Sequence, residues 1–296
     1  MSQEPTTTAA VRTPDARSSR RVALGHSPDP DDAFMFYALA AGKVETHGWS
    51  FRHVLEDIQT LNDRATRGEL EITAISIHAY PFVARKYALT ACGSSMGDGY
   101  GPLVVAREPT AIDDLRGKLI AVPGERTSAF LTLNLLLGPG RFRHRVVMFD
   151  RILDEVAAGR ADAGLIIHEG QLTFATHALH QVVDLGAWWY DQTGLPLPLG
   201  GNCIRRDLGG DNIRQITAIL QRSIEYGLTH RNEAVDYALR YARDLDRFLA
   251  DRFIGMYVNQ WTLDYGEVGR RAVAELLRRG AQIGLVPPVG DIDFVG

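Results

Sequence analysis

Two adjacent residues of this 296-residue chain, His168 and Glu169, are well suited to acid–base chemistry. They come directly after the apolar run Gly164–Ile167, which predicts a buried strand, and directly before a predicted helix. In an α/β fold the carboxyl end of such a strand opens onto the ligand crevice. Imidazole has a free pKa near ~6.5, so modest tuning makes it a base at neutral pH. His168 is therefore the strongest candidate for a general base, and Glu169 either orients it or caps the next helix.

A second candidate site is the pair of hydroxyl side chains at Thr127 and Ser128. They follow the Pro123-Gly124 turn and open an apolar helix. Loop N–H groups, two hydroxyls and a helix N-terminus together suit a carboxylate or another anion. The segment lacks the GxxxxGK[ST] pattern of a nucleotide P-loop. An ordinary helix cap explains the same residues, so both interpretations stay open.

Two further strand ends carry polar residues. Ser76 stands where the predicted strand Glu71–Ala74 gives way to a helix, and its hydroxyl either caps that helix or binds a ligand. His78 lies one turn into that helix and is a weak signal alone. The segment Ser-Pro-Asp-Pro-Asp-Asp-Ala-Phe at residues 27–34 follows the first predicted strand, and the helix that it opens suits a polar or anionic ligand group. Its three aspartates would repel an anion if they faced it, so a capped turn is the favoured interpretation.

The elements that must position these residues alternate between strand and helix. Short apolar, β-branched runs predict strands at 21–25, 50–55, 103–106, 118–122, 146–149, 163–167, 182–185 and 201–205. Helical patterns lie between most of them, which predicts an α/β fold of mostly parallel sheets covered by helices. From residue 211 onward the pattern is helical, with apolar residues at i, i+3 and i+4. We expect this C-terminal helical segment to pack back on the first sheet.

The chain has two places where it is expected to cross between lobes. Val104–Pro109 is a strand that runs into a proline-containing loop, and Gly200–Arg206 joins a Gly-Gly pair to a short strand. Two crossings between two α/β lobes make a hinge, with a ligand crevice between the lobes. We therefore expect residues 21–106 and 206–296 to form lobe one and residues 107–205 to form lobe two.

Composition and charge exclude several classes of protein. Apolar residues make up 45% and charged residues 23% of the chain, as in ordinary globular domains. The net charge of −4 gives no electrostatic footprint for nucleic acid or an anionic membrane, and no apolar run approaches the ~20 residues of a membrane span. The cysteines, Cys92 and Cys203, are far apart, which argues against a disulfide framework or a cysteine-based zinc site. No HExxH motif, and no GxGxxG after a strand, indicates a metal or a nicotinamide cofactor.

The first 20 residues, 1–20, are rich in Thr, Ser, Pro and Arg and lack the apolar stretch of a secretory signal. We therefore expect a disordered tail and a cytoplasmic protein. The expected partner is a small-molecule substrate, with no nucleic acid and no membrane. A homodimer is compatible with the sequence.

Taken together and in order, these motifs resemble the 1,4-dihydroxy-6-naphthoate synthase (MqnD) family of the futalosine pathway of menaquinone biosynthesis. The resemblance runs from about Leu24 to the C-terminus. It is strongest in four segments: Asp150–Leu153, Ala163–Glu169, Val183–Trp189 and Thr193–Gly200.

The resemblance implies the type 2 periplasmic-binding-protein fold, with two α/β lobes, two crossing strands and a cleft between the lobes. It implies carbon–carbon lyase chemistry that needs no metal or organic cofactor. Cyclic dehypoxanthinyl futalosine would be cleaved to 1,4-dihydroxy-6-naphthoate and dihydroxyacetone. The proton-accepting histidine of the family falls on His168. Its substrate-binding positions fall on Ala74, Ile75, Ser76, Thr127 and Ser128.

The chain departs from the family in its first motif, which usually reads Ser-Pro-Cys-Pro-Asn-Asp-Thr-Phe. Here Asp29, Asp31 and Ala33 replace the Cys, Asn and Thr. An asparagine donates a hydrogen bond, whereas an ionised aspartate does not. His78 also differs from the family pattern. The departures put one contact with the substrate in doubt and are compatible with a divergent branch of altered substrate handling.

Two alternatives remain, because a fold does not fix a function. One is a solute-binding protein for a small carboxylate, against which the missing signal peptide and the His168-Glu169 pair argue. The other is a ligand-sensing regulatory domain, which normally carries a helix-turn-helix; no basic DNA-reading segment precedes residue 20.

Overall fold

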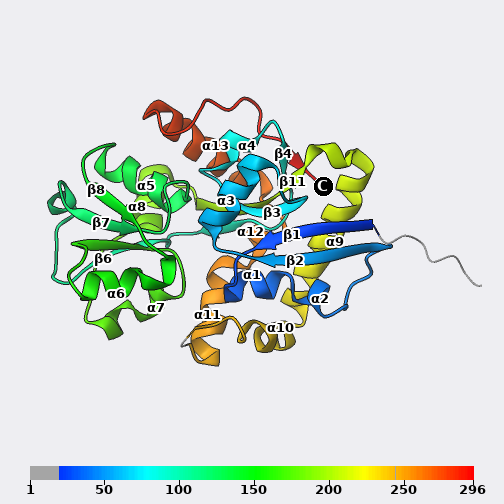
Figure 1. Cartoon of the computed structure of the whole chain (residues 1–296), viewed down its shortest axis with the longest axis horizontal. Coiled ribbons are helices and arrows are strands. Elements are labelled where there is room, and N and C mark those ends of the chain that lie inside the picture. The colour runs from blue at the N-terminus through cyan, green and yellow to red at the C-terminus, as the bar shows by residue number, and fades with distance from the viewer. Residues whose placement is uncertain (1–19, 244) are drawn as a thin grey trace, which may run out of the picture.

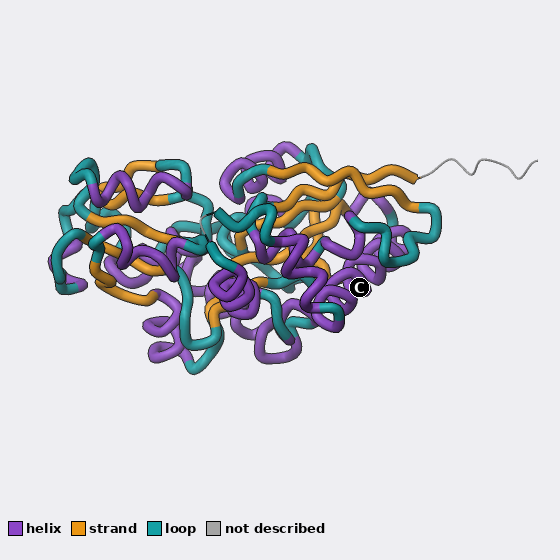
Figure 2. Tube along the Cα trace, turned by 90° about the horizontal axis from the view of Figure 1, so that it is seen from below, coloured by secondary structure: helices purple, strands orange, loops and turns teal. Residues whose placement is uncertain are grey.

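The computed structural model of the chain describes residues 20–243 and 245–296. The expected tail, 1–20, lies outside the described residues except for Arg20. The described chain forms two sheets, each with its own helices, which lie side by side in both views (Figure 1 and Figure 2). No helix of the described residues is long and apolar enough to cross a membrane.

The larger sheet has seven strands in the order β12-β4-β11-β3-β1-β2, with β5 paired to β11. Its strands are β1 (Arg20–His26), β2 (Trp49–Leu55), β3 (Ile72–Ser76), β4 (Tyr87–Thr90), β5 (Ser95–Gly97), β11 (Leu197–Arg205) and β12 (Phe294–Val295). The helices α1 (Pro30–Met35), α2 (Tyr37–Ala40), α3 (Ile58–Arg67) and α4 (Tyr80–Val83) lie between its N-terminal strands along the chain.

The smaller sheet has five strands in the order β10-β6-β9-β7-β8. They are β6 (Leu103–Ala106), β7 (Leu119–Val122), β8 (Arg143–Val146), β9 (Ala163–Ile166) and β10 (His180–Asp184). This part of the chain also forms α5 (Ser128–Leu137), α6 (Ile152–Ala157), α7 (Gly170–Thr173) and α8 (Leu185–Thr193), which appear in green beside the small sheet in Figure 1.

The C-terminal helical segment packs on the large sheet, as expected. It comprises α9 (Gly210–Thr229), α10 (Arg231–Ala238), α11 (Arg247–Tyr257), α12 (Gln260–Leu263) and α13 (Gly266–Gln282). The apolar stripe of α9, including Ile216, Leu220 and Ile224, shares a buried cluster with Val22 and Phe34 of the β1–α1 region. Burial of this stripe against the sheet removes the apolar face of α9 from water, which is why the segment joins lobe one.

The sheets are mixed rather than mostly parallel. Every antiparallel pair among the described strands involves β6 or β11, the first strand after each crossing. The other pairs are parallel. A parallel pair needs a crossover connection, usually a helix. A strand that arrives from the other lobe has no such crossover behind it, so it can enter antiparallel to its neighbours.

Both crossings come one strand earlier than the sequence indicated. Strand β6 belongs to the small sheet and β11 to the large sheet, so the chain crosses between β5 and β6 and again between α8 and β11. The expected boundaries at 106/107 and 205/206 placed each of these strands in the opposite lobe. A short apolar run shows that a strand forms, but its partners are set by packing that the run does not encode.

Some element boundaries also differ from expectation. The strand expected at 146–149 is β8 at Arg143–Val146, whose residues are all exposed at a sheet edge, so no apolar alternation marks it. Helix α8 was not expected. Its signal is Asp184, whose carboxylate accepts hydrogen bonds from the N–H groups of Gly186 (2.8 Å) and Ala187 (3.0 Å), as an N-cap does.

Candidate active site

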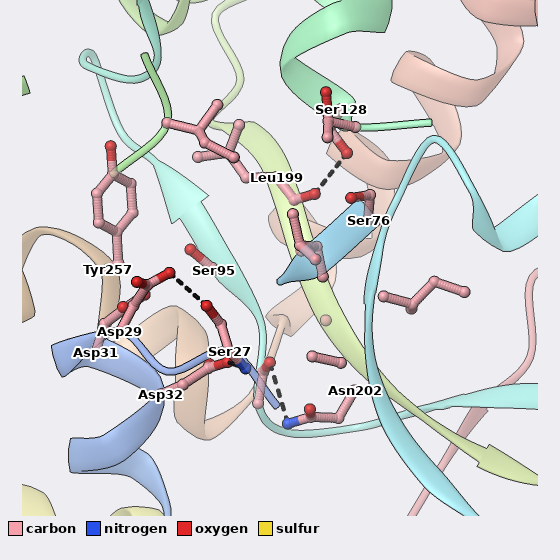
Figure 3. Close-up of a pocket in the computed structure, with 18 of the residues that line it drawn as sticks. Ser27, Asp29, Asp31, Asp32, Ser76, Ser95, Ser128, Leu199, Asn202 and Tyr257 are labelled. Atoms are coloured by element: carbon pink, nitrogen blue, oxygen red, sulfur yellow. Dashed lines mark hydrogen bonds between the residues drawn. The ribbon is translucent and has the colours of Figure 1, made fainter. Parts of the chain in front are cut away.

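A cavity of about 770 Å³, a volume that includes the solvent at its mouth, lies between the two lobes. This size is typical of small-molecule sites. Its walls come from loops and strand ends of both lobes, as Figure 3 shows. The large lobe supplies residues that include Ser27, Asp29, Asp31, Asp32, Ala74, Ile75, Ser76, Ser95, Asn202 and Tyr257; the small lobe supplies Thr127, Ser128, Ala129 and Ile167. Five of the six expected site residues therefore share this cavity, and His168 does not belong to its wall.

The start of helix α5 and the end of strand β3 form one end of the cavity, which we call the hydroxyl end: Ser76, Thr127, Ser128 and Ala129. The Thr127 hydroxyl is the N-cap of α5, since it accepts from the N–H of Phe130 (3.2 Å) and donates to the carbonyl of Gly124 (2.8 Å). The N–H groups of Ser128 and Ala129 have no acceptor among the described residues. The helix cap is therefore observed. Free N–H groups at a helix N-terminus suit an anion, so the ligand-binding interpretation is compatible with the cap and stays a prediction.

The Ser128 hydroxyl and His78 hold the turn that precedes α5. The Ser128 hydroxyl donates to the carbonyl of Leu199, a contact drawn in Figure 3, and accepts from the N–H of His78 (3.2 Å). The imidazole Nδ1 of His78 lies 3.1 Å from the carbonyl oxygen of Thr127. Burial lowers the pKa of His78. His78 is therefore a neutral support of the hydroxyl end and does not line the cavity.

Ser76 is oriented by Asn62, a residue of α3 that the sequence analysis missed. The amide of Asn62 accepts from the N–H of Ser76 (2.9 Å) and donates to its hydroxyl oxygen (3.0 Å). The hydroxyl proton of Ser76 is thereby left for a ligand in the cavity. The signal for Asn62 was available, because this polar residue follows Leu61 on the buried apolar face of α3.

The opposite end of the cavity, which we call the carboxyl end, contains Asp29, Asp31 and Asp32 of the β1–α1 turn (Figure 3). Asp32 accepts from the N–H of Ser27 (2.6 Å), and the Ser27 hydroxyl donates to Asp29. The carboxyl group of Asp31 makes no hydrogen bond to another described residue. Burial, with the nearby Asp32 and Asp29 carboxylates, raises the pKa of Asp31 well above its usual range.

His168 lies beside the carboxyl end, one residue past Ile167 in the cavity wall. Its ring is 6% exposed and packs edge-on against Phe149, with 5.3 Å between ring centroids. Burial lowers the pKa of His168, and the Asp29 carboxylate partly opposes that shift. The N–H of Gly170 donates to Nδ1 (3.3 Å), which places the proton of the neutral ring on Nε2. His168 is thus a neutral imidazole, and the electron pair of its Nδ1 accepts the hydrogen bond from the N–H of Gly170.

Glu169 neither orients His168 through a hydrogen bond nor caps the next helix, which were its two expected roles. Its carboxylate does not cap α7, and neither of its oxygens makes a hydrogen bond to a described residue. Burial, with Asp29 nearby, raises the pKa of Glu169 to about 7. Its nearest cation is Arg243, at 3.5 Å between Nη1 and Oε1. Tyr257 of α11 also lines the cavity, and its hydroxyl donates to Gln171 of α7 (2.7 Å). Arg243 and Tyr257 were not expected, because helical patterns far from the motifs carry no signal of a site. Gln171 follows the His168-Glu169 pair by two residues but was not expected either.

Solved structures with this architecture define the class of fold. The alkanesulfonate-binding protein SsuA from Xanthomonas axonopodis pv. citri has a TM-score of 0.70 at 12% identity, covering 92% of this chain and 96% of that chain. A Candida albicans protein described as having the generic periplasmic binding protein fold has a TM-score of 0.70 at 14% identity, covering 93% and 97%. The chain therefore has a periplasmic-binding-protein-like fold.

More similar proteins define the family. The family model for menaquinone biosynthesis (VitK2_biosynth) matches residues 22–282, and this chain belongs to that family. It is 45% identical over 265 residues to the 1,4-dihydroxy-6-naphtoate synthase of Thermus thermophilus, covering 90% of this chain and 96% of that protein. It is 38% identical over 277 residues to the Streptomyces coelicolor protein of the same name, covering 92% and 97%. The crystal structure of AF1704 from Archaeoglobus fulgidus has 45% identity and a TM-score of 0.86, covering 90% and 98%.

Proposed function

We propose that this chain is a carbon–carbon lyase that cleaves cyclic dehypoxanthinyl futalosine to 1,4-dihydroxy-6-naphthoate and dihydroxyacetone. The observation that carries the proposal is the cavity between the lobes, in which a hydroxyl end faces a carboxyl end with a buried histidine beside it. The membership in the menaquinone-biosynthesis family and the names of two relatives support this substrate and product.

The substrate carboxylate binds at the hydroxyl end in this proposal. There the free N–H groups of Ser128 and Ala129, the hydroxyl of Ser76 and the positive end of the α5 dipole favour a negative charge. The hydroxyl-bearing part of the substrate then points to the carboxyl end. Carboxyl groups accept hydrogen bonds from such hydroxyls. The cavity thereby fixes the direction in which the substrate binds.

His168 removes the proton that starts the carbon–carbon cleavage. Its lowered pKa keeps the ring neutral, and therefore basic, at neutral pH. The ring must leave the N–H of Gly170 and turn toward the cavity past Ile167 for its electron pair to reach the substrate. The aromatic ring formed in the product contributes to the driving force.

The test is to incubate the purified protein with cyclic dehypoxanthinyl futalosine and measure both naphthoate and dihydroxyacetone. We expect the two products to form in a one-to-one ratio. The matched variant His168→Asn should bind the substrate but turn it over far more slowly. Tight binding by the wild-type protein with no product would overturn the lyase proposal and favour a solute-binding protein. We also propose a cytoplasmic site of action, on the basis of the biosynthetic family. A homodimer remains a prediction.

A further inference from the structure

Arg243, in the connection between α10 and α11, is anchored to the large lobe at the carboxyl end of the cavity. Its Nη1 donates to Oδ1 of Asp29 (3.0 Å), and its Nη2 donates to the carbonyl of Pro28 (3.3 Å). Both partners belong to the β1–α1 turn. The two hydrogen bonds use the fork of the guanidinium, which fixes its direction as well as its position.

The same guanidinium reaches the small lobe. Its Nη1 lies 3.5 Å from Oε1 of Glu169, the residue after His168, and the group stacks over the ring of Phe149 at 4.8 Å from the ring centroid. Phe149 in turn packs against the imidazole of His168. The Arg243 side chain therefore contacts the β1–α1 turn of the large lobe and, in the small lobe, both Glu169 and Phe149.

Charged side chains from several elements lie near the imidazole of His168. Asp29 of the β1–α1 turn and Asp150 beside Phe149 raise the pKa of His168, whereas Arg243 lowers it. Arg243 likewise lowers the pKa of Glu169. The guanidinium is the cation that opposes these carboxylates beside the imidazole, so its removal would favour the protonated, catalytically inert form of His168.

We propose that Arg243 is a positioning residue for the base: it joins the two lobes beside His168 through Glu169, the next residue, and it holds the His168 ring in place through Phe149. This inference rests on the proposed function of His168. A lysine keeps the charge but lacks the planar fork and its stacking face, so it reproduces the electrostatic part of the role alone.

The test compares Arg243→Gln and Arg243→Lys with Arg214→Gln, a control that removes an exposed arginine paired with Asp211 on α9. We expect Arg243→Gln to lower kcat by roughly 10- to 100-fold, since misplacement of a catalytic group by about 1 Å costs up to about 10². Its KM changes less. The acidic limb of its kcat/KM profile moves to higher pH, because the pKa of His168 rises. Arg243→Lys keeps the limb near the wild-type position and still loses kcat.

A second readout does not need turnover. The imidazole resonance of His168 in histidine-labelled protein is assigned by its loss in His168→Gln, and its titration midpoint should move upward in Arg243→Gln. An unmoved midpoint, or a kcat within two-fold of the Arg214→Gln control, overturns the proposal. If Arg243→Gln does not fold, Arg243→Lys decides: reduced kcat with an unshifted midpoint supports the proposal, and wild-type kcat overturns it. If the wild-type protein forms no naphthoate, the proposed lyase function fails, and the titration alone decides whether Arg243 acts on His168.

Discussion

The two ends of the cavity differ in how their polar groups are satisfied. At the hydroxyl end, each side-chain hydroxyl is held by a defined partner, such as Asn62 for Ser76 and Gly124 for Thr127. At the carboxyl end, Asp31 makes no hydrogen bond to another described residue. Glu169, which lies beside this end, has no hydrogen-bond partner among the described residues, and Arg243 faces the carboxyl groups of both Asp29 and Glu169. The polar groups of the hydroxyl end are therefore fixed in place, as the proposed binding of an anion requires, whereas the protonation of the carboxyl end depends on burial and on neighbouring charges.

This difference bears on His168, the proposed base, which lies beside the carboxyl end. Burial lowers the pKa of this imidazole, and the charges of Asp29, Arg243 and Asp150 modify that shift, so the pKa responds to the ionisation of the neighbouring carboxyl groups. At the hydroxyl end, His78 is neutral and lies behind the turn that presents the N–H groups of Ser128 and Ala129. The proposed function therefore assigns substrate binding and proton transfer to different ends of the cavity.

The largest expected effect comes from removing the base at the carboxyl end. His168→Asn keeps polarity but cannot accept the proton, so kcat should fall by about 10²- to 10⁴-fold with little change in KM. Because burial lowers the pKa of His168, wild-type kcat/KM should fall only as the pH drops below the usual histidine range. Steady-state rates across pH measure both effects. Turnover near that of the wild type in His168→Asn would exclude His168 as the base.

A smaller effect is expected at the hydroxyl end. Ser128→Ala removes the hydroxyl that donates to Leu199 and accepts from His78, so it loosens the turn that presents the N–H groups. We expect KM to rise by roughly 5- to 30-fold, the equivalent of one or two kcal/mol, with a smaller effect on kcat. In the variant, the carbonyl of Leu199 and the N–H of His78 stay in place but lose the Ser128 hydroxyl as their partner. An unchanged KM would show that the substrate carboxylate binds elsewhere.

Thr127→Ala provides a comparison within the same end. Since Thr127 is the N-cap of α5, its loss should cost about 1 kcal/mol of the free energy of unfolding in addition to any effect on KM. Thr127→Ser is the matched control, because serine caps a helix equally well. Thermal unfolding separates the two contributions. A destabilised Thr127→Ala with unchanged KM would assign Thr127 to the helix cap alone.

The sequence predicted the hydroxyl end better than the carboxyl end. Ala74, Ile75, Ser76, Thr127 and Ser128 all line the one cavity, because strand-to-helix junctions in an α/β fold meet at the crevice. The family resemblance and the fold class are confirmed. The roles of these residues toward the substrate stay predictions.

The carboxyl end could not be predicted to the same extent, for two physical reasons. Arg243 reaches Asp29 across more than two hundred residues of sequence, and such a contact leaves no local pattern. The ionisation of Asp31 depends on burial and on neighbouring carboxylates, neither of which is visible in the residue itself. The expectation that an aspartate at this position cannot donate a hydrogen bond assumed the ionised form. A carboxyl group whose pKa is raised carries a proton over a wider pH range and can donate.

The smallest expected effect is a pH-dependent change in the free energy of unfolding, which tests whether Asp31 is protonated. The pKa of Asp31 is raised in the folded protein, so the folded state binds a proton that the unfolded state has released. The free energy of unfolding therefore decreases as the pH rises from the usual aspartate range toward the raised pKa. Asp31→Asn does not titrate, and it should be more stable than the wild type at pH 8 and equally stable near pH 4. We expect a gain in Tm of roughly 2–4 °C at pH 8, which is about 1 kcal/mol for a protein of this size.

Asp191→Asn, at an exposed position of α8, is the matched control and should show no such pH-dependent gain. Equal stability of Asp31→Asn and the wild type at both pH values would mean that Asp31 is ionised like an ordinary aspartate, and the contrast between the two ends would then reduce to their hydrogen bonding.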